Sequence, residues 1–332
     1  MRSMSIRPLS LRWAPLVLLL AIRIASAASG TVESAQNLLH AMSEAAHTLN
    51  YEGTFIYEHG GQIDTMRIFH RMENGKARER LVSLNGAARE VIRDHREVEC
   101  YLPDEKSVLI EHRSLSMRSF PAVIPHSLDQ LRQYYAIERA GGGRVAGHDV
   151  RAVLISPKDS YRYGYQLWAD RSTNLLLKST LFDHNNRVIE RFMFTNVKIG
   201  GPIPDRALRP EKPGKGTVWY REASGVEEPI SGRLGWQARQ LPPGFALSLR
   251  MVRARRHGPR IQHYVYSDGL AVVSVFVQKI GPQPTAERIH GLMHVGAVHV
   301  FGRVIGDHQI TVVGEVPAKT VDMIGTSFGP AR

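Results

Sequence analysis

The sequence is poor in cysteine, in long apolar runs and in acidic residues. Cys100 is the single cysteine among 332 residues, which excludes an intrachain disulfide, a cysteine-based zinc cluster and an iron–sulfur site. No segment beyond residue 27 reaches about 18 consecutive apolar residues, so the mature chain is predicted to be soluble. Hydrophobic residues make up 43% and charged residues 22%, values typical of a globular protein rather than a disordered or collagen-like one.

Acidic residues are outnumbered, with 31 against 43 basic ones and a formal net charge of +12. Such an excess favours an acidic or anionic partner without defining its kind. Residues 217–332 hold 13 basic and 8 acidic residues, whereas the longer stretch 28–216 is nearly balanced. The C-terminal third therefore carries the denser positive charge.

Residues 1–27 have the three parts of a secretory signal peptide. Three arginines precede an apolar run at 14–22, and Ala25-Ser26-Ala27 fits the rule for cleavage after Ala27. Arg23 behind the run is atypical, and an uncleaved anchor is the alternative. Cleavage would remove four arginines and no acid, lowering the net charge from +12 to +8. A cleavable signal with one cysteine predicts the bacterial periplasm, which makes nucleic acid a poor partner.

Hydrophobic periodicity predicts a helix followed by antiparallel strands. Apolar residues recur with helical spacing over residues 31–50. Alternating patterns then predict strands at 51–57, 63–72, 78–84, 88–93, 98–102, 150–156, 163–169, 175–182 and 188–197. Asn-Gly pairs at 74–75 and 85–86 predict hairpin turns, and short connections favour antiparallel pairing. A short helix at 127–135 and a glycine turn at 141–143 separate the two strand sets.

A stretch rich in proline and glycine, residues 199–216, predicts a linker between two units. Beyond it, strands are predicted at 245–252, 261–266, 270–280, 297–304 and 309–314, with helices at 285–292 and 318–323. We therefore divide the chain into a signal peptide (1–27), a β domain (28–198), a linker (199–216) and a smaller C-terminal domain (217–332).

Aromatic residues alternate along two of the predicted strands, so several of them share one strand face. Two interpretations stay open, namely packing of a sheet against its helices and the wall of an apolar ligand cavity. The lipid-cavity candidates are Tyr51, Phe55, Tyr57, Tyr161, Tyr163, Tyr165 and Trp168.

A run of arginines without acidic residues marks the C-terminal unit. Guanidinium groups bind carboxylates and phosphates with paired hydrogen bonds, so the run is a candidate site for an acidic peptide or a phosphorylated glycolipid. The alternative is a solvated hairpin edge whose charge prevents aggregation. The five candidates are Arg250, Arg253, Arg255, Arg256 and Arg260.

Three patterns that resemble catalytic or metal sites are unconvincing. The GxSxG motif at 325–329 lies at the C-terminus, without the helix, acid and histidine that must follow it. His290 and His294 have helical ligand spacing, but glycines weaken the helix and favour solvent-facing side chains. Glu79 and Glu90 on adjacent strands favour cross-strand ion pairs with Arg78 or Arg89 over acid–base chemistry. We predict no enzyme, no cofactor and no metal.

Short motifs in both units resemble those of the MucB/RseB family. In the first unit they are residues 51–57 (YEGTFIY), 69–71 (FHR), 78–81 (RERL), 162–165 (RYGY) and 176–179 (LLKS). In the second unit they are residues 241–245 (LPPGF), 266–270 (YSDGL) and 311–317 (TVVGEVP). The resemblance covers the mature chain, whereas the arginine run and the six histidines of the second unit match no family motif.

The resemblance implies a mostly β (α+β) fold. It comprises a large half-open antiparallel β-barrel with covering helices, like that of lipoprotein carriers, and a smaller antiparallel β domain with one or two short helices. It also implies a periplasmic negative regulator, commonly a homodimer, whose smaller domain is associated with binding an RseA/MucA-type transmembrane anti-sigma factor. The regulator shields the periplasmic segment of that factor from the site-1 protease, and lipid, lipopolysaccharide or mislocalised lipoprotein releases it. The alternative function is a periplasmic lipoprotein or lipid carrier without a regulatory role.

Overall fold

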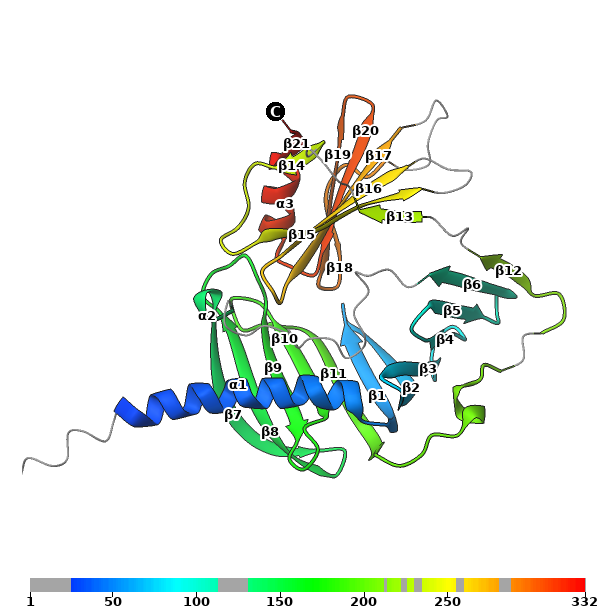
Figure 1. Cartoon of the computed structure of the whole chain (residues 1–332), viewed down its shortest axis with the longest axis vertical. Helices are drawn as coiled ribbons and strands as arrows, with labels where there is room; N and C mark the ends of the chain where they lie inside the picture. The colour runs from blue at the N-terminus through cyan, green and yellow to red at the C-terminus, as the bar shows by residue number, and fades with distance from the viewer. Residues whose placement is uncertain are drawn as a thin grey trace, which may run out of the picture.

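The computed structural model describes residues 25–112, 131–211, 214–221, 226–229, 235–254, 260–280 and 288–331. These residues form two large β-sheets that meet along one side and a separate two-stranded ribbon, with a long helix across the larger sheet and a short one on the smaller sheet (Figure 1). The prediction of a mostly β protein with a large and a small antiparallel unit is therefore confirmed.

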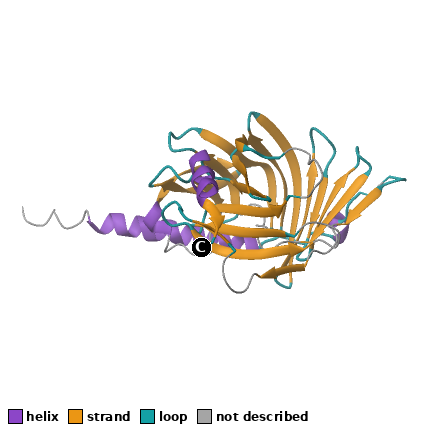
Figure 2. Cartoon of the chain, turned by 90° about the horizontal axis from the view of Figure 1, so that it is seen from above, coloured by secondary structure: helices purple, strands orange, loops and turns teal. Residues whose placement is uncertain are grey.

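The larger sheet has twelve strands in the order β12-β6-β5-β4-β3-β2-β1-β11-β10-β9-β8-β7. Its two end strands, β12 and β7, do not pair with each other in the described chain, so the sheet is half-open, and Figure 2 shows its strands bent into a trough. The strands are β1 (Tyr51–His59), β2 (Gln62–Glu73), β3 (Lys76–Ser83), β4 (Glu90–Arg93), β5 (Glu97–Leu102), β6 (Ser107–His112), β7 (Tyr135–Val145), β8 (His148–Pro157), β9 (Gly164–Asp170), β10 (Leu176–Phe182), β11 (Val188–Ile199) and β12 (Val218–Arg221).

Helix α1 (Ala25–Thr48) crosses the part of this sheet formed by β7 to β11 (Figure 1). Its apolar stripe, which includes Leu38, Leu39 and Met42, is buried in one cluster with Tyr165 and Leu167 of β9. The helical spacing read from the sequence is thus the stripe that faces the sheet. The helix begins six residues before the predicted range of 31–50.

The smaller sheet has seven strands in the order β13-β15-β16-β17-β20-β19-β18. They are β13 (Val226–Pro229), β15 (Ala246–Ala254), β16 (Ile261–Ser267), β17 (Val272–Lys279), β18 (Gly291–Val295), β19 (Val298–Ile305) and β20 (His308–Gly314). Helix α3 (Ala318–Ser327) starts after Pro317 and covers one face of this sheet. Strand β21 (Phe328–Pro330) follows the helix directly and pairs with β14 (Trp236–Ala238) to form a two-stranded ribbon. A Cβ on Gly325 would lie 2.2 Å from the Phe301 ring, so glycine lets α3 approach the sheet closely.

Two sequence predictions of local structure were wrong, and a third was confirmed in part. Gly141 to Gly143 lie inside β7, where the pairing shifts at a bulge after Ala140, instead of in a turn. A Cβ on Gly142 would lie 2.6 Å from the carbonyl oxygen of Val150, so glycine serves close strand contact there.

The predicted helix at 285–292 is replaced by β18 from Gly291 onward, and residues 281–287 lie outside the described chain. The helix predicted at 127–135 is confirmed over the single turn α2 (Leu131–Tyr134), whereas Tyr135 already begins β7 and residues 127–130 lie outside the described chain. Strand pairing therefore overrides a weak helical pattern from Gly291 onward, and at 127–135 it takes only Tyr135.

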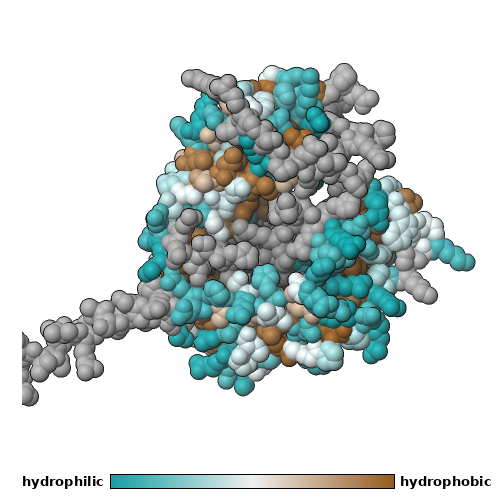
Figure 3. All heavy atoms as spheres, viewed as in Figure 1, coloured by the Kyte–Doolittle hydropathy of each residue, from teal (hydrophilic) through white to brown (hydrophobic). Residues whose placement is uncertain are grey.

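The predicted linker is packed over part of its length. Leu208, the last residue of the short 3-10 helix η1 (Asp205–Leu208), and Ile203 just before it are buried in one cluster with Phe69 of β2. Strand β12 then runs parallel to β6, the one parallel pair among the described strands, so residues 218–221 belong to the larger sheet. In the described chain no helix is long and apolar enough to cross a bilayer. Figure 3 shows that the described residues on this side of the molecule are mostly hydrophilic, with apolar residues gathered in separate patches.

Candidate binding site

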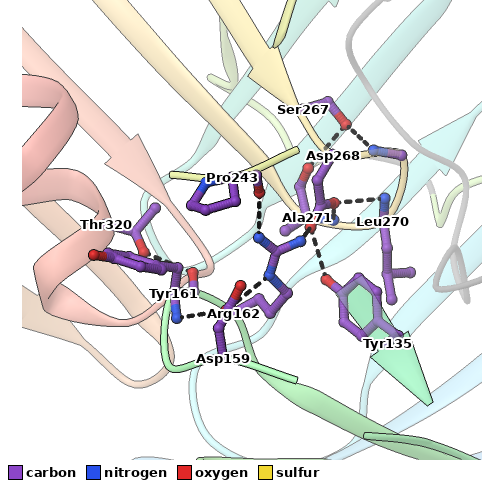
Figure 4. A network of polar contacts seen from close by, with 11 residues as sticks. Tyr135, Asp159, Tyr161, Arg162, Pro243, Ser267, Asp268, Leu270, Ala271 and Thr320 are labelled. Atoms are coloured by element: carbon purple, nitrogen blue, oxygen red, sulfur yellow. Dashed lines mark hydrogen bonds and ion pairs between the residues drawn. The ribbon is translucent and has the colours of Figure 1, made fainter. Parts of the chain in front are cut away.

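The two sheets meet around one buried arginine. Arg162, two residues before β9, is fully buried, and Figure 4 shows its guanidinium between groups from both sheets. Its Nη1 donates to Asp268 Oδ2 at 2.7 Å, its Nε to Asp159 Oδ1 at 3.0 Å and its Nη2 to the Pro243 carbonyl at 2.5 Å. The Arg162–Asp268 ion pair therefore ties the larger sheet to the β16–β17 turn of the smaller sheet.

Asp268 serves the turn and the junction at the same time. Its Oδ1 accepts the backbone N–H groups of Leu270 and Ala271, which shapes the turn. Its Oδ2 accepts the Tyr135 hydroxyl at 2.9 Å and the Arg162 guanidinium. Burial, followed by the charge of Asp268, raises the pKa of Tyr135, so this hydroxyl stays a donor. A buried charge is tolerated only when it is paired and hydrogen-bonded in this way.

Aromatic rings enclose the same guanidinium. The Arg162 Cζ lies 4.8 Å from the ring centroid of Tyr134 and 5.4 Å from those of Tyr135 and Phe245. Desolvated cation–π contacts of this kind contribute up to about 2 kcal/mol each. The junction therefore combines a charge pair with an apolar seal, which holds the two sheets at a defined angle.

Two further contacts support the junction. The turn between β18 and β19 places the Ala297 N–H 3.2 Å from Glu190 Oε1 of β11, and Ala297 is buried in the larger sheet's core. At the start of α3, Thr320 Oγ1 donates to the Tyr161 carbonyl at 2.6 Å, and the Lys319 ammonium lies 4.0 Å from the Tyr161 ring centroid. Four separate parts of the smaller unit thus contact the larger one, namely the segment before β15, the β16–β17 turn, the β18–β19 turn and the start of α3.

The aromatic candidates of the first strand are core residues. Tyr51 stacks on His70 with 4.6 Å between ring centroids, and Phe55 contacts Phe192 edge-on at 5.0 Å. Both candidates are only 1% exposed. Tyr57 is half-buried and donates its hydroxyl to Glu190 at 2.5 Å. Their positions fit the packing interpretation, and a lipid contact there stays a prediction.

The second aromatic group is divided among different environments. Tyr163 and Tyr165 are buried under α1, and burial raises the pKa of Tyr163 to about 12. Tyr161 precedes β9 and contacts α3, so it does not share their surroundings. Trp168 lies on the opposite face of β9 from Tyr165, with the Lys178 ammonium 4.2 Å from its ring centroid. The seven aromatic candidates therefore do not form one continuous wall.

An apolar row that the sequence analysis missed crosses the open half of the larger sheet. Strand register places its members opposite one another on β3, β4, β5, β6 and β12. The first three are half-buried, whereas the last two are 36% and 56% exposed. We call it the open apolar row, and it consists of Leu81, Val91, Cys100, Leu109 and Tyr220.

The open apolar row continues the face that is filled elsewhere. Its neighbour in register on β2 is Ile68, which is fully buried in the cluster with Tyr51 and Phe55. One sheet face is thus packed solid at β1 and β2 and accessible at β6 and β12. No sequence motif reveals this row, because its five members lie on five different strands. They become neighbours only through the pairing register of those strands.

A buried ionic cluster lies beside the row. Glu79 of β3 is 1% exposed, with His70 Nδ1 at 2.9 Å and the Arg93 Nε donor at 2.6 Å. Burial opposes ionisation of Glu79, but the His70 hydrogen bond and the Arg93 charge outweigh it and lower the pKa of Glu79. Arg80 pairs with Glu90 nearby. The predicted cross-strand ion pairs exist, but with partners other than Arg78 and Arg89.

The arginine run is only partly described. Arg250 and Arg253 lie on β15, which has β13 on one side and β16 on the other, so the hairpin-edge interpretation is wrong for them. Arg260 is exposed just before β16. Arg255 and Arg256 lie outside the described residues. Anion binding by this run stays a prediction.

The remaining motifs have structural surroundings. His294 and His299 face each other across β18 and β19 with ring centroids 5.5 Å apart, not along a helix. Burial lowers the pKa of His299, so it favours the neutral form. Ser327 of the GxSxG motif donates its hydroxyl to the Gln240 carbonyl at 3.0 Å. Where the chain is described, no three His, Cys, Asp or Glu side chains are grouped to bind a metal.

Comparison with known proteins relates both units to one family. The MucB/RseB N-terminal domain matches residues 34–212, and the MucB/RseB C-terminal domain matches residues 231–328. The Sigma factor AlgU regulatory protein MucB of Pseudomonas aeruginosa is 31% identical over 96% of this chain and 98% of its own length. The Sigma-E factor regulatory protein RseB of Escherichia coli K12 is 24% identical over 96% of this chain and 99% of its own.

Solved structures give the same relationship. The complex structure of Pseudomonas aeruginosa MucA/MucB has a chain 29% identical to this one with a TM-score of 0.66, covering 90% of this chain and 99% of that chain. A crystal structure of MucB is 27% identical with a TM-score of 0.63, covering 90% of this chain and 98% of that one. Because the similarity runs through both units, this chain belongs to the MucB/RseB family.

Proposed function

We propose that this protein is a negative regulator in the periplasm that binds the periplasmic segment of a MucA/RseA-type transmembrane anti-sigma factor. Bound in this way, the segment is shielded from regulated proteolysis. The observation that carries the proposal is full-length similarity to MucB, one structure of which is a complex with MucA(peri). The named relatives are regulatory proteins, and we propose that this chain likewise acts by binding, without catalysis.

The sequence supports the location and the chemistry of this partner. Residues 1–27 have the features of a cleavable signal peptide, which directs the mature chain to the periplasm. The positive charge of residues 217–332 complements an acidic segment and speeds its diffusional encounter. A homodimer belongs to the same proposal, and light scattering of the mature chain measures it directly.

We place release by lipid on the open apolar row. Leu109 and Tyr220 offer accessible apolar surface, whereas the equivalent face at Tyr51 and Phe55 is filled by side chains. An acyl chain therefore has room in the open half of the sheet. A ligand that prefers one arrangement of the two units shifts their equilibrium and thereby changes the affinity for the anti-sigma segment.

The junction supplies a test of this linkage. Asp268→Asn keeps the size of the side chain but removes the charge that faces Arg162. We expect this substitution to let the angle between the two sheets vary more and to weaken binding of the anti-sigma segment. Asp159→Asn is the matched control because Asp159 also accepts from Arg162 but its side chain is 26% exposed. Equal affinities of both variants and the wild type would show that the junction does not control binding.

Equilibrium binding tests the function itself. The purified periplasmic segment of the organism's own MucA/RseA-type anti-sigma factor is titrated into the mature chain by calorimetry. We expect saturable binding with a Kd of about 1 μM or tighter, as for specific interfaces of standard size. A chain that gives no binding heat and does not co-elute with the segment contradicts the regulator.

The second function, a lipid carrier without a regulatory role, rests on the open apolar row. It needs only the larger sheet, so it leaves the smaller unit and its buried junction without a purpose. Depletion separates the two functions: a carrier predicts failed lipoprotein sorting with an unchanged stress response, and a regulator predicts the reverse.

A further inference from the structure

Strand β18 is an exposed edge. It ends the order of the smaller sheet and, within the described chain, pairs with β19 alone. All five residues of β18 are exposed, and three of them are large and apolar. The exposed fractions are 49% for Leu292, 49% for Met293 and 78% for Val295.

The usual protections of an edge strand are missing from β18. Proteins block such edges with charged side chains, proline or a bulge, because unpaired N–H and C=O groups attract another strand. The strand Gly291–Val295 contains no proline and no lysine, arginine or acid, and its register with β19 runs without a shift. At the end of the larger sheet, by contrast, β12 carries Arg221, which is paired with Glu97 at 2.6 Å.

An added strand would extend an apolar face that already exists. The register places Met293 opposite Val300 of β19, which is opposite Val313 of β20. Both valines are half-buried, and Val295 stands opposite Val298 at the hairpin turn. Apolar side chains at alternate positions of an incoming strand would cover this face, as in β-strand addition.

The local charge and geometry favour one kind of occupant. Residues 288–305 contain two arginines and three histidines but no acidic residue, so the edge complements an acidic segment and repels a second copy of itself. The turn after β18 lies on the larger sheet, where a Cβ on Gly60 would be 3.9 Å from Gly296 Cα. This neighbour leaves more room for a single extended chain than for a second folded domain.

We propose that β18 is the docking edge for an extended, acidic segment of the partner protein, which adds to the smaller sheet as an eighth strand. The inference rests on the proposed function, because the segment belongs to the periplasmic part of the anti-sigma factor. Backbone hydrogen bonds supply affinity. The apolar residues Met293 and Val295 on one face, and Leu292 on the other, select the side chains of the incoming strand.

The test compares two charge-neutral double variants of the mature chain. Met293→Gln/Val295→Gln removes the apolar surface of the edge, and Ile63→Gln/Leu84→Gln removes surface of similar exposure, 56% and 52%, from the larger sheet. Against the purified periplasmic segment, the edge variant should bind about tenfold or more weakly. The control variant should stay within about twofold of the wild type. Hydrogen exchange of the wild type should show new protection at β18 amides on binding.

Each result has one meaning. If the wild type binds the segment but neither the edge variant nor β18 exchange changes, the docking edge is wrong while the regulator stands. If the wild type does not bind the segment, the regulator is wrong and the docking edge with it. If the edge variant loses self-association instead of segment binding, a second copy is the occupant and the proposal is overturned. Hydrogen exchange at the β18 amides of the wild type, with and without the segment, tests the docking edge even if the edge variant folds poorly.

Discussion

The two halves of the larger sheet share one face but use it differently. From β1 and β2 across β11 to β7, this face is filled by a cluster that includes Tyr51, Phe55 and Phe194. From β3 to β6 and β12, the same face carries the open apolar row, of which Leu109 and Tyr220 are exposed. The filled half stabilises the fold, and the open half is where we propose that an apolar ligand binds.

The difference follows from how the side chains of each half pack against one another. In the filled half, large aromatic side chains stand opposite one another on neighbouring strands, as Phe55 of β1 and Phe194 of β11 do with 5.9 Å between ring centroids. The β3 to β6 strands have their own small cluster of Ile92, Tyr101, Val108 and Ile110 on the other face. Function in this half therefore does not compete with the main core for the same side chains.

The largest expected effect is the loss of an aromatic ring from the filled half. Phe194→Ala should lower the free energy of unfolding by about 3 to 5 kcal/mol, because the cavity cannot collapse within a packed cluster. Leu109→Ala in the open half should cost about 1 kcal/mol or less, because that side chain is already 36% exposed. Urea unfolding midpoints measure both, and equal losses would show that the halves do not differ.

A slightly smaller effect is expected at the border between the halves. Glu79→Gln removes the buried carboxylate charge that faces Arg93 and His70, and breaking such a pair costs about 3 kcal/mol. The substitution also removes a pH dependence. Because the folded pKa of Glu79 is lowered, its contribution is present above the ordinary value of 4.5 and is lost as the pH falls below it.

Unfolding midpoints from pH 7 to pH 3 check this sign. The wild type should lose stability more steeply than Glu79→Gln below about pH 4.5. Parallel curves for the two proteins would mean that Glu79 is not held ionised by His70 and Arg93.

A spectroscopic effect is expected at the middle of the open apolar row. Cys100 is the only thiol, and burial raises its pKa, so labelling with a solvatochromic maleimide needs mildly alkaline buffer. Adding lipopolysaccharide should shift the emission of the label to shorter wavelengths. A Cys100→Ser/Lys76→Cys chain, labelled at an exposed site of β3, is the control, and equal shifts at both sites would contradict binding at the row.

The smallest effect is on stability at the rim of the open half. Tyr220→Ser should change the free energy of unfolding by no more than about 0.5 kcal/mol, because the ring is 56% exposed. The same substitution should weaken lipopolysaccharide binding measurably in the label assay. A large loss of stability without a change in binding would place Tyr220 with the filled half.

The sequence predicts strands better than it predicts sites. The alternation of apolar and polar residues located most strands, because the buried face of a strand depends only on the local order of its residues. The Arg162–Asp268 pair joins residues 106 positions apart, and the open apolar row exists only through the register of five strands. No local pattern contains such information. The aromatic candidates were chosen from local alternation, which is why they led to the filled half and to the junction.

The most direct measurement for the whole account is the cleavage rate of the anti-sigma periplasmic segment by its site-1 protease. The segment is digested alone, with the mature chain, and with the mature chain preincubated with lipopolysaccharide. The account predicts that the chain slows cleavage and that lipopolysaccharide restores the rate. Equal cleavage rates with and without the chain would contradict the shielding function.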